Sequence, residues 1–439
     1  MHLDSRGLAV TASNCTAVEL LDSAVTSYLG MRKDTAELCA AVGQADPSCV
    51  LGLCLDGYLS MHACSREGRA KAQQILTQAA VAANDTNATG RERLHILALE
   101  AWCKGDLVAA VDAWEQVLAD FPLDVLALRL AQFMTSYLGR SQGIRDSVAR
   151  AFPAWDEGFR DYGFVVSCYA YGLEEAGEYE MAERFGRRAV EMNPKDLWGA
   201  HAVAHVMEMQ GRVQDGVQWI ASGEKHWEGC GNFVNHLWWH CALLHLAASK
   251  YDDALELYDR KVRADGSAEY LDLANAAALL WRLEQAEVDV GQRWDELAQR
   301  VGRHADEHLF VFVDLHKLVA IAANAPRHAQ DFLESCVHYA SDLKCTEAHV
   351  MRDVGLPIAK AVLAHRKRDY GGAADLLLPV RDLIHRIGGS HAQRDLFEQM
   401  LIDAVLRSER LSLARSLLST RIENRPGDLW ARRTIASLS

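Results

Sequence analysis

The stretch Gly177-Glu-Tyr-Glu-Met-Ala182 lies at the centre of the pattern that decides the fold. Ala170 precedes it, Ala189 follows it, and Asn193-Pro194 closes the segment. Glycine permits a tight turn, small residues let two helices touch, and proline cannot continue a helix. The spacing is that of a tetratricopeptide repeat, about 34 residues that form two antiparallel helices.

The same frame recurs along the chain, which indicates a repeat array rather than a chance match. The clearest repeats span 91–124, 163–196, 197–230, 235–265, 354–387 and 395–428. Between them we expect less regular helices, with Gly57 and Gly68 as breaks and another break over 140–160. No Ser/Gly-rich linker is visible, so the sequence predicts one all-α, right-handed superhelical solenoid over 1–439.

The composition supports a helical protein and disfavours some classes of binding partner. Of 439 residues only 8 are proline, and 60 acidic against 46 basic residues give a net charge of −14. A basic field is absent, which disfavours nucleic acid and anionic membranes as partners. The 11 cysteines contain no C-x-x-C pair and indicate reduced thiols in a cytoplasmic protein. We expect no signal peptide and no membrane-spanning segment.

Two histidine pairs carry the strongest functional signal: His201-x-x-x-His205, followed by Glu208, and His236-x-x-x-His240. Side chains four residues apart share one face of a helix. The repeat frame places both pairs on the first helices of consecutive repeats, facing the concave surface. Four imidazoles and a carboxylate would then meet in one groove.

Three interpretations of this cluster remain open. Neutral imidazoles of His201, His205, His236 and His240 could bind Zn²⁺ or Fe²⁺. Alternatively, Glu208, His205 and His240 could act as metal-free acid/base or ligand-binding groups. The histidines could also simply stack on neighbouring tryptophans and hydrogen-bond to carboxylates.

Further polar and aromatic residues are candidates for ligand binding. Trp239, Tyr171 and Glu174 are expected along the same groove. Arg394 follows Gly388-Gly-Ser390 and could bind a carboxylate or phosphate, although a turn with Ser390 as N-cap explains the segment equally.

Other motifs carry less weight. His304-Ala-Asp-Glu-His308 matches the H-x-x-E-H of one class of zinc peptidases, but its flanks indicate the start of a helix. Asp314 and His316 diverge by about 200° on a helix, so both cannot face the groove. Cys230 and Cys241 flank the second histidine pair, where we expect buried, inert thiols rather than a nucleophile.

Several longer segments make the chain resemble the tetratricopeptide repeat protein 38 family over nearly its full length. They include Arg93-Leu-His-Ile-Leu-Ala-Leu-Glu100, Trp238-Trp-His-x-Ala-Leu243, Arg352-Asp-Val-Gly-Leu-Pro357 and Gly388-Gly-Ser-x-Ala-Gln-Arg-Asp395. The resemblance implies an all-helical cytosolic protein and supplies no substrate.

The sequence therefore predicts a groove that forms a His/Glu/Trp-lined pocket for a small molecule, open to metal-dependent or acid/base chemistry of the hydrolytic type. The alternative is a non-catalytic scaffold whose groove holds a peptide or helix of a partner. A homodimer is compatible with either, and enzymatic activity stays an open question.

Overall fold

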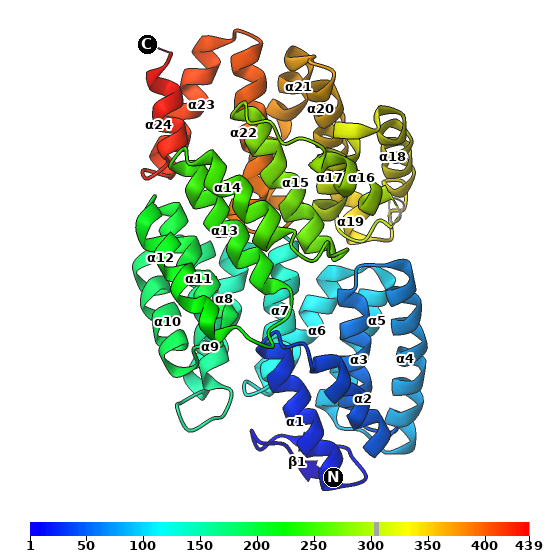
Figure 1. Cartoon of the computed structure of the whole chain (residues 1–439). Helices are drawn as coiled ribbons and strands as arrows, with labels where there is room; N and C mark the ends of the chain where they lie inside the picture. The colour runs from blue at the N-terminus through cyan, green and yellow to red at the C-terminus, as the bar shows by residue number, and fades with distance from the viewer. Residues whose placement is uncertain (303–306, 439) are drawn as a thin grey trace. The chain divides into compact units, whose positions relative to one another are not determined.

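The computed structural model describes residues 1–302 and 307–438, which form helical hairpins joined by short turns (Figure 1). The chain divides into two compact units. Unit 1 comprises Met1–Val203, Glu224–Phe233 and Lys344–Thr346. Unit 2 comprises Ala204–Gly223, Val234–Leu343 and Glu347–Ser439.

Helices α1 to α12 precede the loop over 224–232. Their bounds are α1 (Cys15–Leu29), α2 (Thr35–Ala45), α3 (Val50–His62), α4 (Arg66–Asp85), α5 (Gly90–Lys104), α6 (Leu107–Asp120), α7 (Val125–Tyr137), α8 (Ser141–Ala151), α9 (Tyr162–Glu175), α10 (Tyr179–Met192), α11 (Leu197–Met209) and α12 (Val213–Gly223). Before them, β1 (His2–Leu3) pairs antiparallel with β2 (Ala9–Val10), a small hairpin that the sequence did not predict.

Helices α13 to α24 form the rest of the chain. Their bounds are α13 (Phe233–Ala247), α14 (Tyr251–Leu257), α15 (Tyr270–Gln285), α16 (Arg293–Gly302), α17 (Val311–Asn324), α18 (Pro326–Tyr339), α19 (Thr346–Val350), α20 (Leu356–Arg366), α21 (Tyr370–Leu377), α22 (His391–Arg407), α23 (Leu411–Asn424) and α24 (Leu429–Ala436). Short 3-10 or π turns extend α14, α21 and the start of α20.

The Gly177 stretch folds as its pattern predicts. Gly177 adopts φ 84°, a left-handed value that suits glycine, in the turn between α9 and α10. Ala182 and Ala189 are fully buried on α10, and α10 ends at Met192 directly before Asn193-Pro194. Two consecutive helices also fall largely within each of the clearest predicted repeats, from α5/α6 to α22/α23, while the division of the chain at those repeat boundaries stays a prediction.

Two expectations about helix breaks are wrong. Residues 141–151 form α8 rather than a break, and Gly57 and Gly68 lie inside α3 and α4. Both glycines mark close packing, because a Cβ on Gly57 would lie 2.5 Å from Leu99 Cδ2 and one on Gly68 would lie 2.3 Å from the Ser60 carbonyl oxygen.

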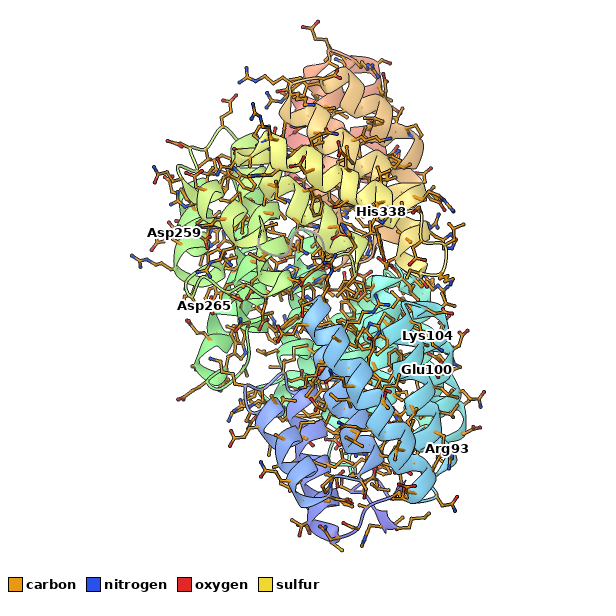
Figure 2. All side chains as sticks on the ribbon, turned by 90° about the vertical axis from the view of Figure 1, so that its right-hand side faces the viewer. Arg93, Glu100, Lys104, Asp259, Asp265 and His338 are labelled. Atoms are coloured by element: carbon orange, nitrogen blue, oxygen red, sulfur yellow. The ribbon has the colours of Figure 1, made fainter. Side chains whose placement is uncertain are left out.

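Helix α5 illustrates how the hairpins divide polar from apolar residues. Arg93, Glu100 and Lys104 follow one side of the helix, where Lys104 pairs with Glu100 (Figure 2). His95 and Leu99 lie on the other side and are fully buried. This amphipathic arrangement buries one face of α5 against its neighbours α3, α4 and α6.

The protein is thus an all-α array of tetratricopeptide-like hairpins, as the sequence predicts. The single continuous array over 1–439 and its right-handed sense stay predictions. Among the described residues, no helix combines the length and the apolar character that crossing a membrane requires.

Candidate functional site

The candidate site lies in unit 2, on the second half of α11 and on α13, α15 and α22. Helix α13 is apolar on nearly every side, and its residues from His236 to Leu244 are all buried. Gly216 on α12 permits close packing there, because a Cβ at this position would lie 2.5 Å from Leu244 Cδ1. The helix is therefore a core element, and its two histidines are held inside unit 2.

A chain of contacts links the polar side chains of these helices. His240 Nδ1 lies 2.8 Å from Glu208 Oε2, and His240 Nε2 lies 3.2 Å from His236 Nε2. His236 Nδ1 lies 2.9 Å from Asn275 Nδ2, and Asn275 Oδ1 accepts from Gln393 Nε2 at 3.3 Å. Figure 1 shows α15 and α22, which carry the two amides, side by side.

These partners define the protonation of the two rings. Asn275 Nδ2 donates to His236 Nδ1, so the proton of that ring is on Nε2. His240 then accepts at Nε2 and donates from Nδ1 to Glu208. Burial lowers the pKa of His236 and of His240 well below the usual 6.5, and the charge of a neighbouring protonated histidine would lower each further. Both imidazoles are neutral at pH 7.

His205 and Trp239 complete the cluster. The ring of His205 lies 4.4 Å from that of His240, and Trp239 stacks on His236 at 5.3 Å. Ligand nitrogens of His205, His236 and His240 all lie within 4.8 Å of one another. The two histidine pairs were predicted to lie close together, and these three imidazoles do.

A cavity of about 510 Å³ adjoins this cluster within unit 2, and Glu208 forms part of its wall. Apolar wall residues include Met209, Leu243 and Leu244. Helix α24 contributes Trp430 and Arg433. Glu208 is thus the one member of the cluster that meets both the histidines and the cavity among the described residues.

Buried ion pairs form the polar side of the cavity. Arg421 binds Asp395 at 2.8 Å and Asp428 at 2.7 Å, and Arg425 lies 3.0 Å from Asp395. Burial opposes ionisation of Asp395, but Arg421 and Arg425 outweigh it and hold the pKa of this carboxyl below its usual range. Burial lowers the pKa of the nearby Arg282 to about 10, and raises that of Glu208.

Three predicted site residues belong to unit 1. His201 stacks on Trp198 at 5.0 Å and on Tyr171 at 5.6 Å. The hydroxyl of Tyr171 lies 3.2 Å from Ser136 Oγ, and Glu174 is fully buried. A role of His201 as a metal ligand, and of Tyr171 and Glu174 in ligand binding, stays a prediction.

Arg394 lies in unit 2, in the first turn of α22. Its guanidinium donates to the Gly389 carbonyl oxygen and lies 3.1 Å from His391 Nδ1. Gly388 and Gly389 both have positive φ, which fits the turn that precedes α22. The Ser390 backbone N–H donates to Gln393 Oε1 at 3.0 Å. These contacts support the predicted turn, while anion binding by Arg394 stays a prediction.

The remaining motifs lie outside the cluster's contacts. His245 lies 3.3 Å from Asp253, and Cys241 is buried with its pKa raised to about 12 by that burial. His304 lies outside the described residues, whereas His308 Nδ1 lies 3.0 Å from Asp314. His316 donates from Nδ1 to the Phe312 carbonyl oxygen at 2.7 Å.

Sequence reasoning missed the roles of Asn275 and Gln393. Asn275 is separated from Gln393 by 118 residues, so no local spacing connects them. A signal did exist: Asn275 is a lone amide in the apolar run Leu273-Ala-Asn-Ala-Ala-Ala-Leu-Leu280. A polar side chain in such a run must find a buried partner.

Comparison with known proteins finds distant structural similarity and no family. No family model matches the chain. Human IFIT1, solved as a dimer with PPP-AAAA, aligns over 96% of this chain and 94% of its own at 14% identity, with a TM-score of 0.43. Yeast Tom70 aligns over 96% and 95% at 13% identity, with a TM-score of 0.34. These scores describe distant similarity between helical proteins.

Proposed function

We propose that unit 2 binds a small amphipathic molecule in its 510 Å³ cavity, with Glu208 as the acceptor of a hydroxyl, amino or water proton. One observation carries the proposal: the Glu208 carboxylate lies in the cavity wall while a buried, neutral His240 holds one of its oxygens at 2.8 Å. Carboxylates fixed in this way on a cavity wall are typical of binding and acid/base sites.

The volume and lining suit a small organic ligand. Binding pockets for such molecules usually enclose about 300 to 1,000 Å³ and are mostly apolar, with a few placed polar groups. Here Leu243, Leu244 and Trp430 offer apolar surface. The ligand should therefore carry a hydrocarbon or aromatic part of moderate size.

Donors on the wall define the other part of the ligand. The buried Nε1 of Trp281 has no hydrogen-bond partner among the described residues, and this tryptophan lines the cavity. Arg425 and Arg433 also line the cavity. Arg425 contacts Asp395, and Arg433 donates to the Ala247 carbonyl oxygen. A guanidinium has five N–H donors, so each arginine has further donors beyond these contacts. An oxygen-rich acceptor group, such as a carboxylate, fits these donors.

Glu208 would supply the chemistry. Its carboxylate can take a proton from water or a ligand hydroxyl, and the Nδ1–H of His240 keeps the carboxylate oriented during that step. Such a base assists hydrolytic reactions without any further group. Acid/base chemistry of this kind is the catalytic part of the proposal.

Binding can be tested with anilinonaphthalene sulfonate, a fluorescent probe that combines an aromatic body with an anionic group. We expect saturable, blue-shifted fluorescence from the full-length chain. Ala247 lines the cavity and its neighbour Ala248 does not, so Ala247→Trp should remove most of the signal and Ala248→Trp should preserve it. Circular dichroism would verify that both variants fold. Equal fluorescence of the two variants would contradict binding in this cavity.

The base can be tested separately with p-nitrophenyl acetate, a general ester probe. We expect hydrolysis above the buffer rate, reduced roughly 100-fold or more by Glu208→Gln, because general base catalysis contributes about 10² to 10⁴ in rate. An unchanged rate in this variant would remove catalysis by Glu208 and leave binding alone. A stable peptide partner recovered with a chain that does not bind the fluorescent probe would favour the scaffold alternative.

We also propose that the chain belongs to the tetratricopeptide repeat protein 38 family and is cytoplasmic. The segments around Arg93–Glu100 and Trp238–Leu243 support the family, and the free thiols support the location. The family assignment supplies no activity, so the proposed binding site depends only on the geometry of unit 2.

A further inference from the structure

We propose that the imidazoles of His205, His236 and His240 together bind one divalent transition-metal ion of the zinc type. The ion would bind on the Nε2 side of His240, whereas Glu208 contacts the Nδ1 side. The inference therefore goes beyond the proposed ligand cavity and does not depend on it.

Distances between the ring nitrogens support a shared ion. Zinc binds imidazole nitrogen at about 2.0 to 2.1 Å, so two nitrogens of one tetrahedral site are about 3.3 Å apart. His236 Nε2 and His240 Nε2 are 3.2 Å apart. A hydrogen bond between the two imidazoles gives a similar distance, so the position of a third imidazole is the observation that favours an ion. The nitrogen of His205 lies within 4.8 Å of the other two, which brings a third ligand within small side-chain adjustments.

The outer nitrogens of two rings have the partners that metal-binding histidines use. Such a histidine usually donates its second N–H to a carboxylate, a carbonyl or another oxygen, which orients the ring. His240 Nδ1 meets Glu208, and His236 Nδ1 meets Asn275. A half-turn of the Asn275 amide presents Oδ1 instead of Nδ2, so the proton of His236 moves to Nδ1 and Nε2 becomes a ligand. Gln393 can follow this change because its amide offers both a donor and an acceptor.

The surroundings select the kind of ion. All three histidines are buried, so an ion bound to them would lie inside unit 2. Imidazole ligands favour Zn²⁺, Co²⁺, Ni²⁺ and Cu²⁺, whereas Mg²⁺ and Ca²⁺ prefer oxygen. The nearby Glu208 carboxylate partly offsets the added positive charge.

Cobalt provides a direct test. After stripping with a chelator, the full-length chain is titrated with Co²⁺ and followed by visible absorption, elemental analysis and thermal unfolding. We expect about one ion per chain, the intense d–d bands of a low-coordinate nitrogen site, and an unfolding midpoint that rises with Co²⁺ concentration. Zn²⁺ should displace Co²⁺ and abolish the bands, whereas Mg²⁺ should not.

Variants identify the ligands. His236→Ala and His240→Ala should each lose the bands, while His245→Ala is the matched control on the same helix and should retain them. Asn275→Asp retains an acceptor for Gln393 and offers a permanent acceptor to His236 in place of the amide donor. It should therefore tighten Co²⁺ binding roughly 10-fold, whereas Asn275→Leu should weaken it by about 10- to 100-fold. A folded wild-type chain that binds no stoichiometric Co²⁺ or Zn²⁺ would overturn the proposal. Bands that persist in His236→Ala would also overturn it. Either result leaves binding of the fluorescent probe in the cavity unaffected.

Discussion

Glu347, a residue of α19 in unit 2, places a buried carboxyl group against the first residue of α17. It is 2% exposed, and its Oε2 accepts from the Val311 backbone N–H at 2.7 Å. Burial raises its pKa from 4.5 to about 8, against the opposing hydrogen bond from Val311, and the charge of Asp314 adds to the increase. Glu347 therefore keeps its proton at neutral pH in the folded protein.

This raised pKa makes stability depend on pH. The unfolded chain releases the proton near pH 4.5, whereas the folded chain holds it up to about pH 8, so the free energy of unfolding falls as pH rises across that interval. Glu347→Gln cannot ionise but still accepts from Val311. We expect it to raise the free energy of unfolding at pH 8 by roughly 2 to 5 kcal/mol, at about 1.4 kcal/mol per pKa unit, with little change at pH 4.5.

Chemical denaturation of both chains between pH 4.5 and pH 8 measures the difference. Glu334→Gln, on the exposed side of α18, is the control for the loss of a carboxylate and should change stability by less than about 0.5 kcal/mol. A gain for Glu347→Gln that is equal at pH 4.5 and pH 8 would show that ionisation is not its source.

Spacing within one helix predicted the histidines but not the side chains that hold them. His236 and His240 are four residues apart, and helical geometry alone places them on one face. Asn275 and Gln393 come from other helices, and only the tertiary packing of α13, α15 and α22 brings them to His236. Sequence reasoning predicted the histidine pairs and left the orientation of their rings open.

Among the secondary-structure elements of unit 1, α8 and α9 pack closely at Gly172. A Cβ at this position would lie 2.7 Å from Arg145 Cα and 3.1 Å from the Ile144 carbonyl oxygen. Backbone atoms cannot move aside as a side chain can, so the helices would have to separate. Gly172→Ala should lower the free energy of unfolding by about 1 to 3 kcal/mol.

Gly43 is the matched control, an exposed glycine within α2 whose added Cβ would meet nothing within 4 Å. Gly43→Ala should stabilise the protein by roughly 0.5 to 1 kcal/mol, because alanine loses less conformational freedom in a helix. Urea denaturation of the two variants should thus shift in opposite directions. Stabilisation by Gly172→Ala would contradict the close approach of α8 to α9.

The packing partner of Gly172 is also the helix that sequence reasoning missed. The break expected over 140–160 reflects the glycine and the proline inside this stretch, Gly143 and Pro153. The buried residues of α8 are Ile144, Ser147, Val148 and Ala151, which is the spacing of an amphipathic helix. Because α8 is short and has glycine and proline near its ends, its sequence is only a weak signal for a helix. Packing against α9 stabilises the helical conformation.

For the whole molecule, the repeat frame predicted most of the hairpins because each repeat specifies its fold locally. Turn glycines such as Gly105, Gly177 and Gly211 recur with positive φ, and small residues recur where helices touch. The units were not predictable in this way, since Glu224–Phe233 and Lys344–Thr346 join unit 1 from far along the chain. Long-range pairing of short segments leaves no periodic signal.

Repeat arrays also predict how far the effect of a bound ion extends. Their stability is approximately a sum of repeat terms and nearest-neighbour terms, so an ion on three histidines should protect their own helices most and distant repeats least. At 100 times its dissociation constant the ion adds about 2.7 kcal/mol, which slows hydrogen exchange through local opening about 100-fold.

Hydrogen–deuterium exchange with and without Zn²⁺ can map this effect along the chain. Protection should be largest over 204–209 and α13, smaller in α15 and α22, and absent from α1 to α4. The same experiment with His236→Ala should show no change in any of these segments. Uniform protection of all helices would mean that the chain unfolds as one cooperative body and not repeat by repeat, whereas protection confined to segments without these histidines would place the ion elsewhere.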